Sequence, residues 1–319
     1  MIRFLTLCLL ARILAAQCPN LTAFTPPEKI QSTDRAYRFE GGYVAVIGEM
    51  RVDSDGSPVA YHPLNLGTTH LCNGLDPVID GKRVRDKKRA TSPCFAAVEK
   101  AIQAKWDPAR SPEFFIYGFV APTTGAKWGG PSGGKPIPVQ AVNDPAPGFF
   151  ISTTARQVPG AAALPESQRY LNADAIPYVV VPTSLVNGGS LRRGGLAWVW
   201  NTAKGHTAPA VMGDVQSAFG EGSVALAQLV ESGQLDPLSP AMLNGTGPVP
   251  APYVRTDGKV KVSLNPKGPL VFVYFDGAPS PALPDYRPGT LGTAVDRVLA
   301  RFGGAEGLKK CLAPKAKAP

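Results

Sequence analysis

The sequence predicts a mainly β, α+β fold: a single domain with a β-barrel-like or sandwich core, a few packed helices and long loops rich in Gly and Pro. The chain has 34 Gly and 33 Pro among 319 residues, about a fifth of its length, which excludes a coiled coil, a helical bundle or a helical solenoid. Hydrophobic residues make up 44%, enough to bury a core. Short β-type runs alternate with Gly and Pro along the chain, as in β-rich domains.

Six apolar runs rich in β-branched and aromatic residues predict the strands. They cover residues 43–52, 114–120, 148–153, 178–181, 196–200 and 270–275.

Three stretches with helical periodicity predict helices over residues 92–105, 223–232 and 293–302. The second has the clearest ends, because Ser223 is a good N-cap and Gly233 a good stop signal. We expect long loops over 122–147 and 236–269, where Pro and Gly gather. The Lys/Ala/Pro composition of residues 312–319 predicts a disordered basic tail.

Residues 1–16 have the pattern of a secretory signal peptide: Arg3, an apolar stretch from Phe4, and small residues up to Ala16. Arg12 interrupts the apolar stretch, so a buried first helix is the alternative. No other run approaches the ~20 apolar residues that span a bilayer. We therefore expect a secreted, extracellular protein with no membrane contact after removal of the signal.

Four cysteines remain after residue 16, namely Cys18, Cys72, Cys94 and Cys311. Four cysteines in an oxidising compartment predict two disulfides with three possible pairings. Cys72–Cys94 is our first expectation, because it would close the loop that holds the basic run 82–89. That run is most simply a solvated loop, and binding of an anionic polymer is the alternative.

Several motifs are incomplete. Residues 129–135 match the phosphate-binding pattern G-x-x-x-x-G-K, but Pro136 follows where Ser or Thr is needed. No G-x-S-x-G is present for serine hydrolysis. Asp53-Ser54-Asp55-Gly56 is similar to the start of a calcium loop, but Pro58 follows and no Glu closes it. Calcium binding at this stretch is therefore weakly indicated.

The strongest functional signal lies between residues 196 and 229. A predicted strand with Trp198 and Trp200 leads through Asn201 to Asp214, and Glu221 follows seven residues later between two glycines. Two carboxylates on loops beside aromatic side chains suit glycoside hydrolysis, in which one protonates the leaving oxygen and the other activates water or attacks. From spacing alone, however, the favoured interpretation is a solvent-exposed turn with ordinary helix caps.

The sequence also resembles the fungal-type chitosanases of glycoside hydrolase family 75. The resemblance rests on four stretches in the same order: Ile-Gly-Glu-Met-Arg-Val-Asp-Ser-Asp-Gly at 47–56, Phe-Phe-Ile-Ser-Thr-Thr at 149–154, Ala-Ile-Pro-Tyr-Val-Val-Val-Pro at 175–182, and Met-Gly-Asp at 212–214 leading to Gly-Glu-Gly-Ser-Val-Ala-Leu-Ala at 220–227.

The resemblance implies a secreted, endo-acting hydrolase that cleaves β-1,4 linkages of chitosan with inversion. It covers most of residues 40–232 and implies Asp214 and Glu221 as the catalytic pair, with no metal and no organic cofactor. We expect residues 17–311 to form a single catalytic domain. Asp53 and Asp55 alternate on one strand and so share a face. We expect them to bind substrate, together with Trp198, Trp200 and Asn201.

The sequence does not fix the glycan substrate or the acid and base roles of the catalytic pair. Arg51 and Ser54 depart from the family's acidic first motif, and the net charge of +9 would attract neutral or anionic polymers unless the cleft is locally acidic. A hydrolase of another wall glycan, such as peptidoglycan, and a non-catalytic binder of wall polymers are the alternatives. We assign Glu221 as acid and Asp214 as base, because Glu has the longer reach and the higher reference pKa. The partner we expect is a polysaccharide and not nucleic acid, bound by a monomer.

Overall fold

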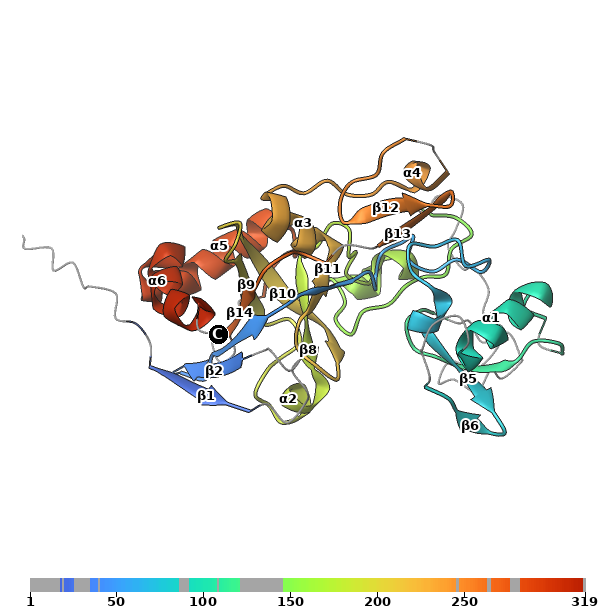
Figure 1. Cartoon of the computed structure of the whole chain (residues 1–319), viewed down its shortest axis with the longest axis horizontal. Helices are drawn as coiled ribbons and strands as arrows, with labels where there is room; N and C mark the ends of the chain where they lie inside the picture. The colour runs from blue at the N-terminus through green and yellow to red at the C-terminus, as the bar shows by residue number, and fades with distance from the viewer. Residues whose placement is uncertain are drawn as a thin grey trace, which may run out of the picture.

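The computed structural model describes residues 18, 20–25, 35–39, 41–85, 92–107, 109–120, 146–244, 247–262, 265–275 and 282–317 (Figure 1). The predicted signal 1–16, the second half of the basic run 82–89, the motif at 129–135 and most of the loop 122–147 lie outside the described residues. The described chain forms a large mixed sheet covered by helices, and a smaller lobe at one end of the molecule. The predicted mainly β, α+β class is confirmed, with an open sheet in place of a closed barrel.

The large sheet has nine strands. Most neighbours are antiparallel, but the pairs β10–β8 and β11–β4 are parallel. Their order across the sheet is β1 (Leu21–Phe24), β2 (Arg35–Phe39), β3 (Val44–Gly48), β14 (Leu270–Phe275), β9 (Leu196–Asn201), β10 (Thr207–Gln216), β8 (Tyr178–Pro182), β11 (Glu221–Ser223) and β4 (Arg51–Asp53).

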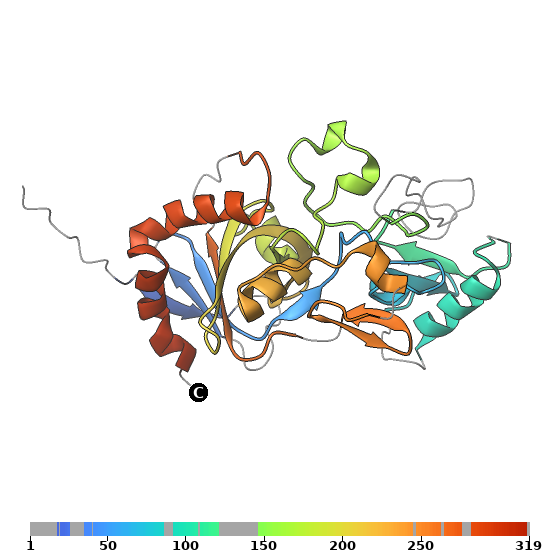
Figure 2. The same ribbon diagram turned by 90° about the horizontal axis from the view of Figure 1, so that it is seen from above.

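Helices cover both faces of this sheet. On β14, Val271, Val273 and Phe275 pack into the core under α5 (Pro288–Leu299) and α6 (Gly304–Lys317). The residues that alternate with them pack into the opposite core, with α2 (Thr183–Asn187) and α3 (Val224–Ser232). Because the strand is buried on both faces, it is a continuous apolar run without polar alternation. Figure 2 shows α5 and α6 at the end of the molecule away from the small lobe.

The small lobe has its own apolar core, which contains Tyr61, Phe114 and Phe150. It is built from α1 (Pro93–Gln103) and a three-stranded sheet of β6 (Lys82–Arg83), β5 (Leu75–Ile79) and β7 (Glu113–Ile116). The predicted Cys72–Cys94 disulfide is present here. A hairpin of β12 (Tyr253–Thr256) and β13 (Lys259–Val262), preceded by α4 (Pro240–Asn244), lies near this end (Figure 1).

Two predicted strands differ from the structure. Residues 43–52 form two strands, because the chain leaves the β14 edge after β3 and joins β11 as β4, where the Arg51 amide donates to the Gly220 carbonyl. Residues 148–153 contribute only one bridge, from Ser152 to Phe119. The predicted loop 236–269 contains α4, β12 and β13.

The prediction of a disordered tail is wrong for residues 312–317, which continue α6. Leu312 is fully buried in the core under the sheet, and the Lys315 ammonium lies 5.5 Å from the centre of the Tyr37 ring. The second disulfide, Cys18–Cys311, ties this helix to the chain just before β1. Tertiary burial and the disulfide therefore order a segment whose composition alone favours disorder.

No helix in the described part of the chain combines the length and apolar character needed to cross a bilayer.

Candidate active site

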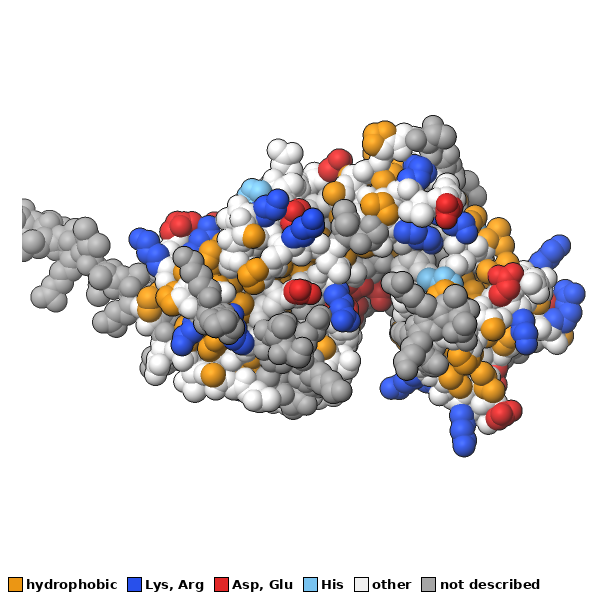
Figure 3. Space-filling view, in the orientation of Figure 1, with side chains coloured by type: hydrophobic (Ala, Val, Ile, Leu, Met, Phe, Trp, Pro, Cys, Tyr) orange, Lys and Arg blue, Asp and Glu red, His pale blue; other side chains and the backbone are white. Residues whose placement is uncertain are grey.

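A cleft of about 580 Å³ opens between the large sheet and the small lobe. Its sheet side carries Asp53, Asp214 and Glu221, and its lobe side carries Tyr61 and Tyr117. The space-filling view shows acidic side chains inside the hollow that separates the two parts (Figure 3). The cleft thus brings together carboxylates that the sequence places on separate segments.

A β-bulge aims Asp214 into this cleft. Along β10, Val211 pairs with Tyr178 and Met212 with Val179, but Asp214 pairs with Val180, so Gly213 is the extra residue. Because side chains alternate along a strand, the extra residue moves Asp214 to the face that Val211 occupies. Gly213 is required here, since an added Cβ would lie 2.6–2.7 Å from atoms of Leu171 and Tyr178.

Glu221 approaches from the other side of β8. Gly222 of β11 pairs antiparallel with Val179, so the next step of the ladder sets Glu221 opposite Val180, the residue that Asp214 pairs with. Side chains directly opposite one another in a sheet share a face. Asp214, Val180 and Glu221 therefore form a row across the sheet, and all three line the cleft.

Asp53 and Asp55 come from the turn at the end of β4. The Asp55 amide donates to Asp53 Oδ1 at 2.9 Å, and the Tyr61 hydroxyl donates to Asp55 Oδ1 at 2.6 Å. The Tyr178 hydroxyl donates to the Asp55 carbonyl at 2.8 Å. Gly56, with φ +83°, has no room for a Cβ, which would lie 1.9 Å from the Leu171 carbonyl oxygen.

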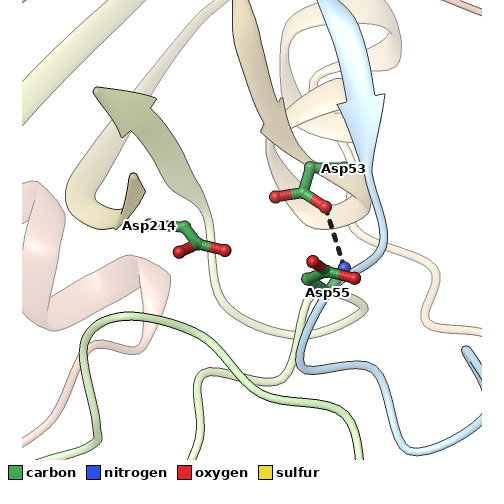
Figure 4. A group of neighbouring side chains, drawn as sticks. All are labelled: Asp53, Asp55 and Asp214. Carbon is green, nitrogen blue, oxygen red and sulfur yellow. Dashed lines mark hydrogen bonds between the residues drawn. The ribbon is translucent and has the colours of Figure 1, made fainter. Parts of the chain in front are cut away.

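Asp53, Asp55 and Asp214 form a tight group, which we call the aspartate cluster. One carboxylate oxygen from each lies within 4.8 Å of the other two, and the three side chains converge in Figure 4. Glu221 lines the same cleft without belonging to this close group. No Lys or Arg among the described residues forms an ion pair with the cluster.

Burial and mutual repulsion raise the pKa values of the cluster. The pKa of Asp214 rises to about 8, first because of burial and then because of the Asp53 charge, although the backbone amides of Val215 and Ala155 donate to its Oδ1 and oppose the rise. Burial, followed by the charges of Asp53 and Asp214, holds the pKa of Asp55 well above its usual range. Burial also raises the pKa of Asp53.

The same geometry suits a cation. Three carboxylate oxygens within 4.8 Å of one another match the oxygen ligands that Ca²⁺ and Mg²⁺ take. A proton or a divalent cation would each relieve the repulsion in the cluster. The aspartate cluster is therefore the part of the described chain where a metal would bind, and a chelator separates the two possibilities.

The predicted binding role of Trp198, Trp200 and Asn201 does not fit their positions. Trp198 and Trp200 are 2% and 9% exposed and belong to the core under α5 and α6. Asn201 is fully buried, and its Oδ1 accepts from the amides of Ala203 and Lys204. The two tryptophans alternate on one face of β9 as expected, but helices cover that face.

The aromatic side chain with exposed surface in the cleft is Tyr117, which is 37% exposed. The Arg83 guanidinium lies 5.1 Å from its ring centre and 3.8 Å from that of Phe115. Tyr117 lies within the predicted strand 114–120 and directly follows β7 in the structure, so its aromatic character was visible in the sequence. Nothing local to the sequence indicated that the small lobe turns this ring toward Asp214.

No protein-family model matches this chain, and a search of curated proteins finds no match either. The geometry of the cleft therefore carries the functional argument, together with the resemblance stated above.

Proposed function

We propose that the chain is a secreted, chitosanase-like glycoside hydrolase that cleaves β-1,4 linkages inside an amino-sugar polysaccharide. The observation that carries this proposal is Asp214, a carboxyl group with a pKa of about 8 in an open cleft that Glu221 also lines. A raised carboxyl pKa beside a second carboxylate is the arrangement that glycosidic acid–base catalysis needs. Two disulfides suit an oxidising compartment and so support export.

In this mechanism Asp214 is the general acid. With a pKa of about 8 it carries a proton at neutral pH and donates it to the glycosidic oxygen as the bond to the anomeric carbon breaks. Glu221 accepts a proton from water, whose oxygen bonds to the anomeric carbon from the opposite side. These roles reverse our assignment from sequence, because burial among like charges outweighs the small difference between the reference pKa values of Asp and Glu.

The placement of the pair supports inversion. Asp214 and Glu221 lie on strands separated by β8, and Glu221 is outside the group of oxygens within 4.8 Å. Inverting enzymes need space for a water molecule between sugar and base, whereas retaining enzymes hold the carboxyl groups only ~5–5.5 Å apart.

The acidity of the cleft supports an amino sugar as the substrate unit. The chain has a net charge of +9, yet four carboxyl groups and no Lys or Arg line the cleft among its described residues. A protonated amine on the sugar would satisfy the carboxylate of Asp53 and reduce the repulsion within the cluster. The local field thus opposes the overall charge, as a chitosan-like ligand requires.

The test is release of reducing ends from chitosan, chitin and peptidoglycan by the purified protein. We expect cleavage of chitosan, and a loss of ~10²–10⁴-fold in turnover for Asp214→Asn and for Glu221→Gln. Proton NMR of the first product should show the inverted anomer. Full activity of both amide variants would overturn the assignment of the pair. Loss of wild-type activity with a chelator, restored by Ca²⁺ or Mg²⁺, would show instead that the cluster acts through a metal.

A further inference from the structure

A second cavity, of about 800 Å³, adjoins the catalytic cleft and shares Thr154 and Ala155 with it. Three arginines line it, Arg156, Arg192 and Arg193, and no Asp or Glu is among the lining residues that the structure describes. We call it the arginine pocket. Its charge is opposite to that of the aspartate cluster, although the two sites meet.

Arg156 is held in place by its surroundings. Its Nε donates to the Tyr286 hydroxyl at 3.0 Å, and a Cβ added at Gly194 would lie only 3.1–3.4 Å from the guanidinium. Gly194 has φ +84°, so this position favours glycine both for its backbone conformation and for the space it leaves. A fixed guanidinium loses little entropy on binding an anion.

Arg192 and Arg193 lie on the turn that leads into β9, and both side chains are exposed. No described carboxylate forms an ion pair with Arg156 or Arg193. Among the described residues, three arginines thus line one concavity, and none of its described wall residues is acidic. Arginine side chains bind carboxylates through two parallel N–H donors, which suits a carboxylate-bearing ligand.

The backbone connects the two sites directly. The Ala155 amide donates to Asp214 Oδ1, and the next amide, that of Arg156, donates to the Gly213 carbonyl. Ala155, whose amide bonds to Asp214, directly precedes Arg156 in the chain, and consecutive Cα atoms are ~3.8 Å apart. The arginine pocket therefore adjoins the proposed catalytic acid. A polymer lying along the cleft would therefore meet both charges.

We propose that the arginine pocket binds a carboxylate-bearing sugar of the same glycan whose amino sugar lies at the aspartate cluster. This inference rests on the proposed function and narrows its substrate class. The substrate is a wall-type glycan that carries both charges, an amine on one sugar and a carboxylate on a neighbouring one. Pure chitosan, which lacks carboxylates, would fill the cleft and leave the arginine pocket without a partner.

The test is binding, measured by calorimetry on the Asp214→Asn variant so that no probe is consumed. Three oligosaccharide probes of equal length are compared: de-N-acetylated chitosan, chitin, and de-N-acetylated peptidoglycan strands stripped of peptides. The third alone carries both amine and lactyl carboxylate. We expect it to bind at least 10-fold more tightly than the chitosan probe.

Replacement of the exposed arginines gives the matched comparison. We expect Arg192→Gln with Arg193→Gln to weaken the carboxylated probe ~10–100-fold, as loss of charged hydrogen bonds predicts, and to leave the chitosan probe unchanged. Arg297→Gln, on the exposed face of α5, removes one positive charge that is not among the described residues lining the pocket, and it should change neither affinity. The proposal is overturned if the double substitution weakens the binding of both probes equally, or weakens the binding of neither.

The outcome separates this inference from the proposed function. Cleavage of chitosan with no preference for the carboxylated probe would reject the arginine pocket and keep the hydrolase. Tight arginine-dependent binding of that probe, with full activity of Asp214→Asn, would reject the catalytic assignment and keep the pocket.

Discussion

Asp76 in the small lobe and Asp214 in the cleft have opposite electrostatic surroundings. Asp76 is 1% exposed, and Arg83 pairs with its Oδ2 through Nε at 2.7 Å and Nη2 at 2.6 Å. Asp214 accepts only two backbone amides and has Asp53 and Asp55 as close neighbours. Asp76 is thus neutralised by an ion pair with Arg83. In the cleft, several carboxyl groups lie together, and their mutual repulsion favours the protonated form. Such an arrangement costs stability and is characteristic of functional sites.

The largest expected effect is the loss of turnover when Asp214 is replaced by its amide. Asp214→Asn should lower turnover ~10²–10⁴-fold. The free energy of unfolding should be kept at neutral pH and increased at higher pH, because the amide stays uncharged where Asp214 would ionise beside Asp53. Activity on chitosan and chemical denaturation of the same sample measure both quantities. An equal loss of stability and activity would make Asp214 a structural residue.

Asp76→Asn should give the opposite pattern. Loss of the carboxylate leaves the partly buried Arg83 without its ion-pair partner, which costs about 2–3 kcal/mol. Turnover per folded molecule should stay within a few-fold of wild type, since Asp76 is not among the residues lining the cleft. Denaturant midpoints report the stability, and kcat below the transition reports the activity. Unchanged stability would show that the pair with Arg83 contributes nothing net.

The pH dependence of stability sharpens the comparison. The pKa of Asp214 rises to about 8 in the folded protein, against ~3.9 when unfolded. Between these values the folded state binds more protons than the unfolded state, so the free energy of unfolding falls as pH rises from 4 to 8.

Asp214→Asn removes this contribution, so wild type should lose roughly 3–4 kcal/mol more than the variant between pH 5 and pH 8. The difference between the two proteins matters, because His70, whose pKa is lowered to about 4 by burial, adds the opposite trend to both. Parallel curves for the two proteins would show that Asp214 titrates normally.

The fold was predictable where one strand or helix carries its own signal. The apolar run 270–275 and the capped helix that follows Ser223 both form at the expected residues. The composition of residues 312–319 gave a wrong prediction for 312–317. Burial of Leu312 and the disulfide of Cys311 hold α6 against the core.

The sequence predicted which carboxylates line the cleft but not which aromatic side chain does. Asp53, Asp55, Asp214 and Glu221 all line one cleft, since strand ends that carry carboxylates meet across β8. Trp198 and Trp200 share a face of β9, but the sequence does not say that α5 and α6 cover that face. The bulge at Gly213, which aims Asp214, depends on pairing with a strand that is distant in sequence.

The smallest expected effect concerns Tyr117, where the two compared regions touch. Its ring is exposed in the cleft, and Arg83, the partner of Asp76, packs against it. Aromatic contacts of this kind are worth ~0.5–1.5 kcal/mol, so Tyr117→Ala should raise KM about 2–10-fold with kcat nearly unchanged.

Tyr117→Phe keeps the ring and is the matched control, with KM expected near wild type. If Arg83 holds the ring in place, Asp76→Asn should raise KM slightly on its own, and the effect of Tyr117→Ala should be smaller in that background than in wild type. Additive effects would mean that the ring is positioned by the small-lobe core alone. An unchanged KM in Tyr117→Ala would remove Tyr117 from the substrate surface and leave the acidic wall as the part of the cleft that binds the sugar.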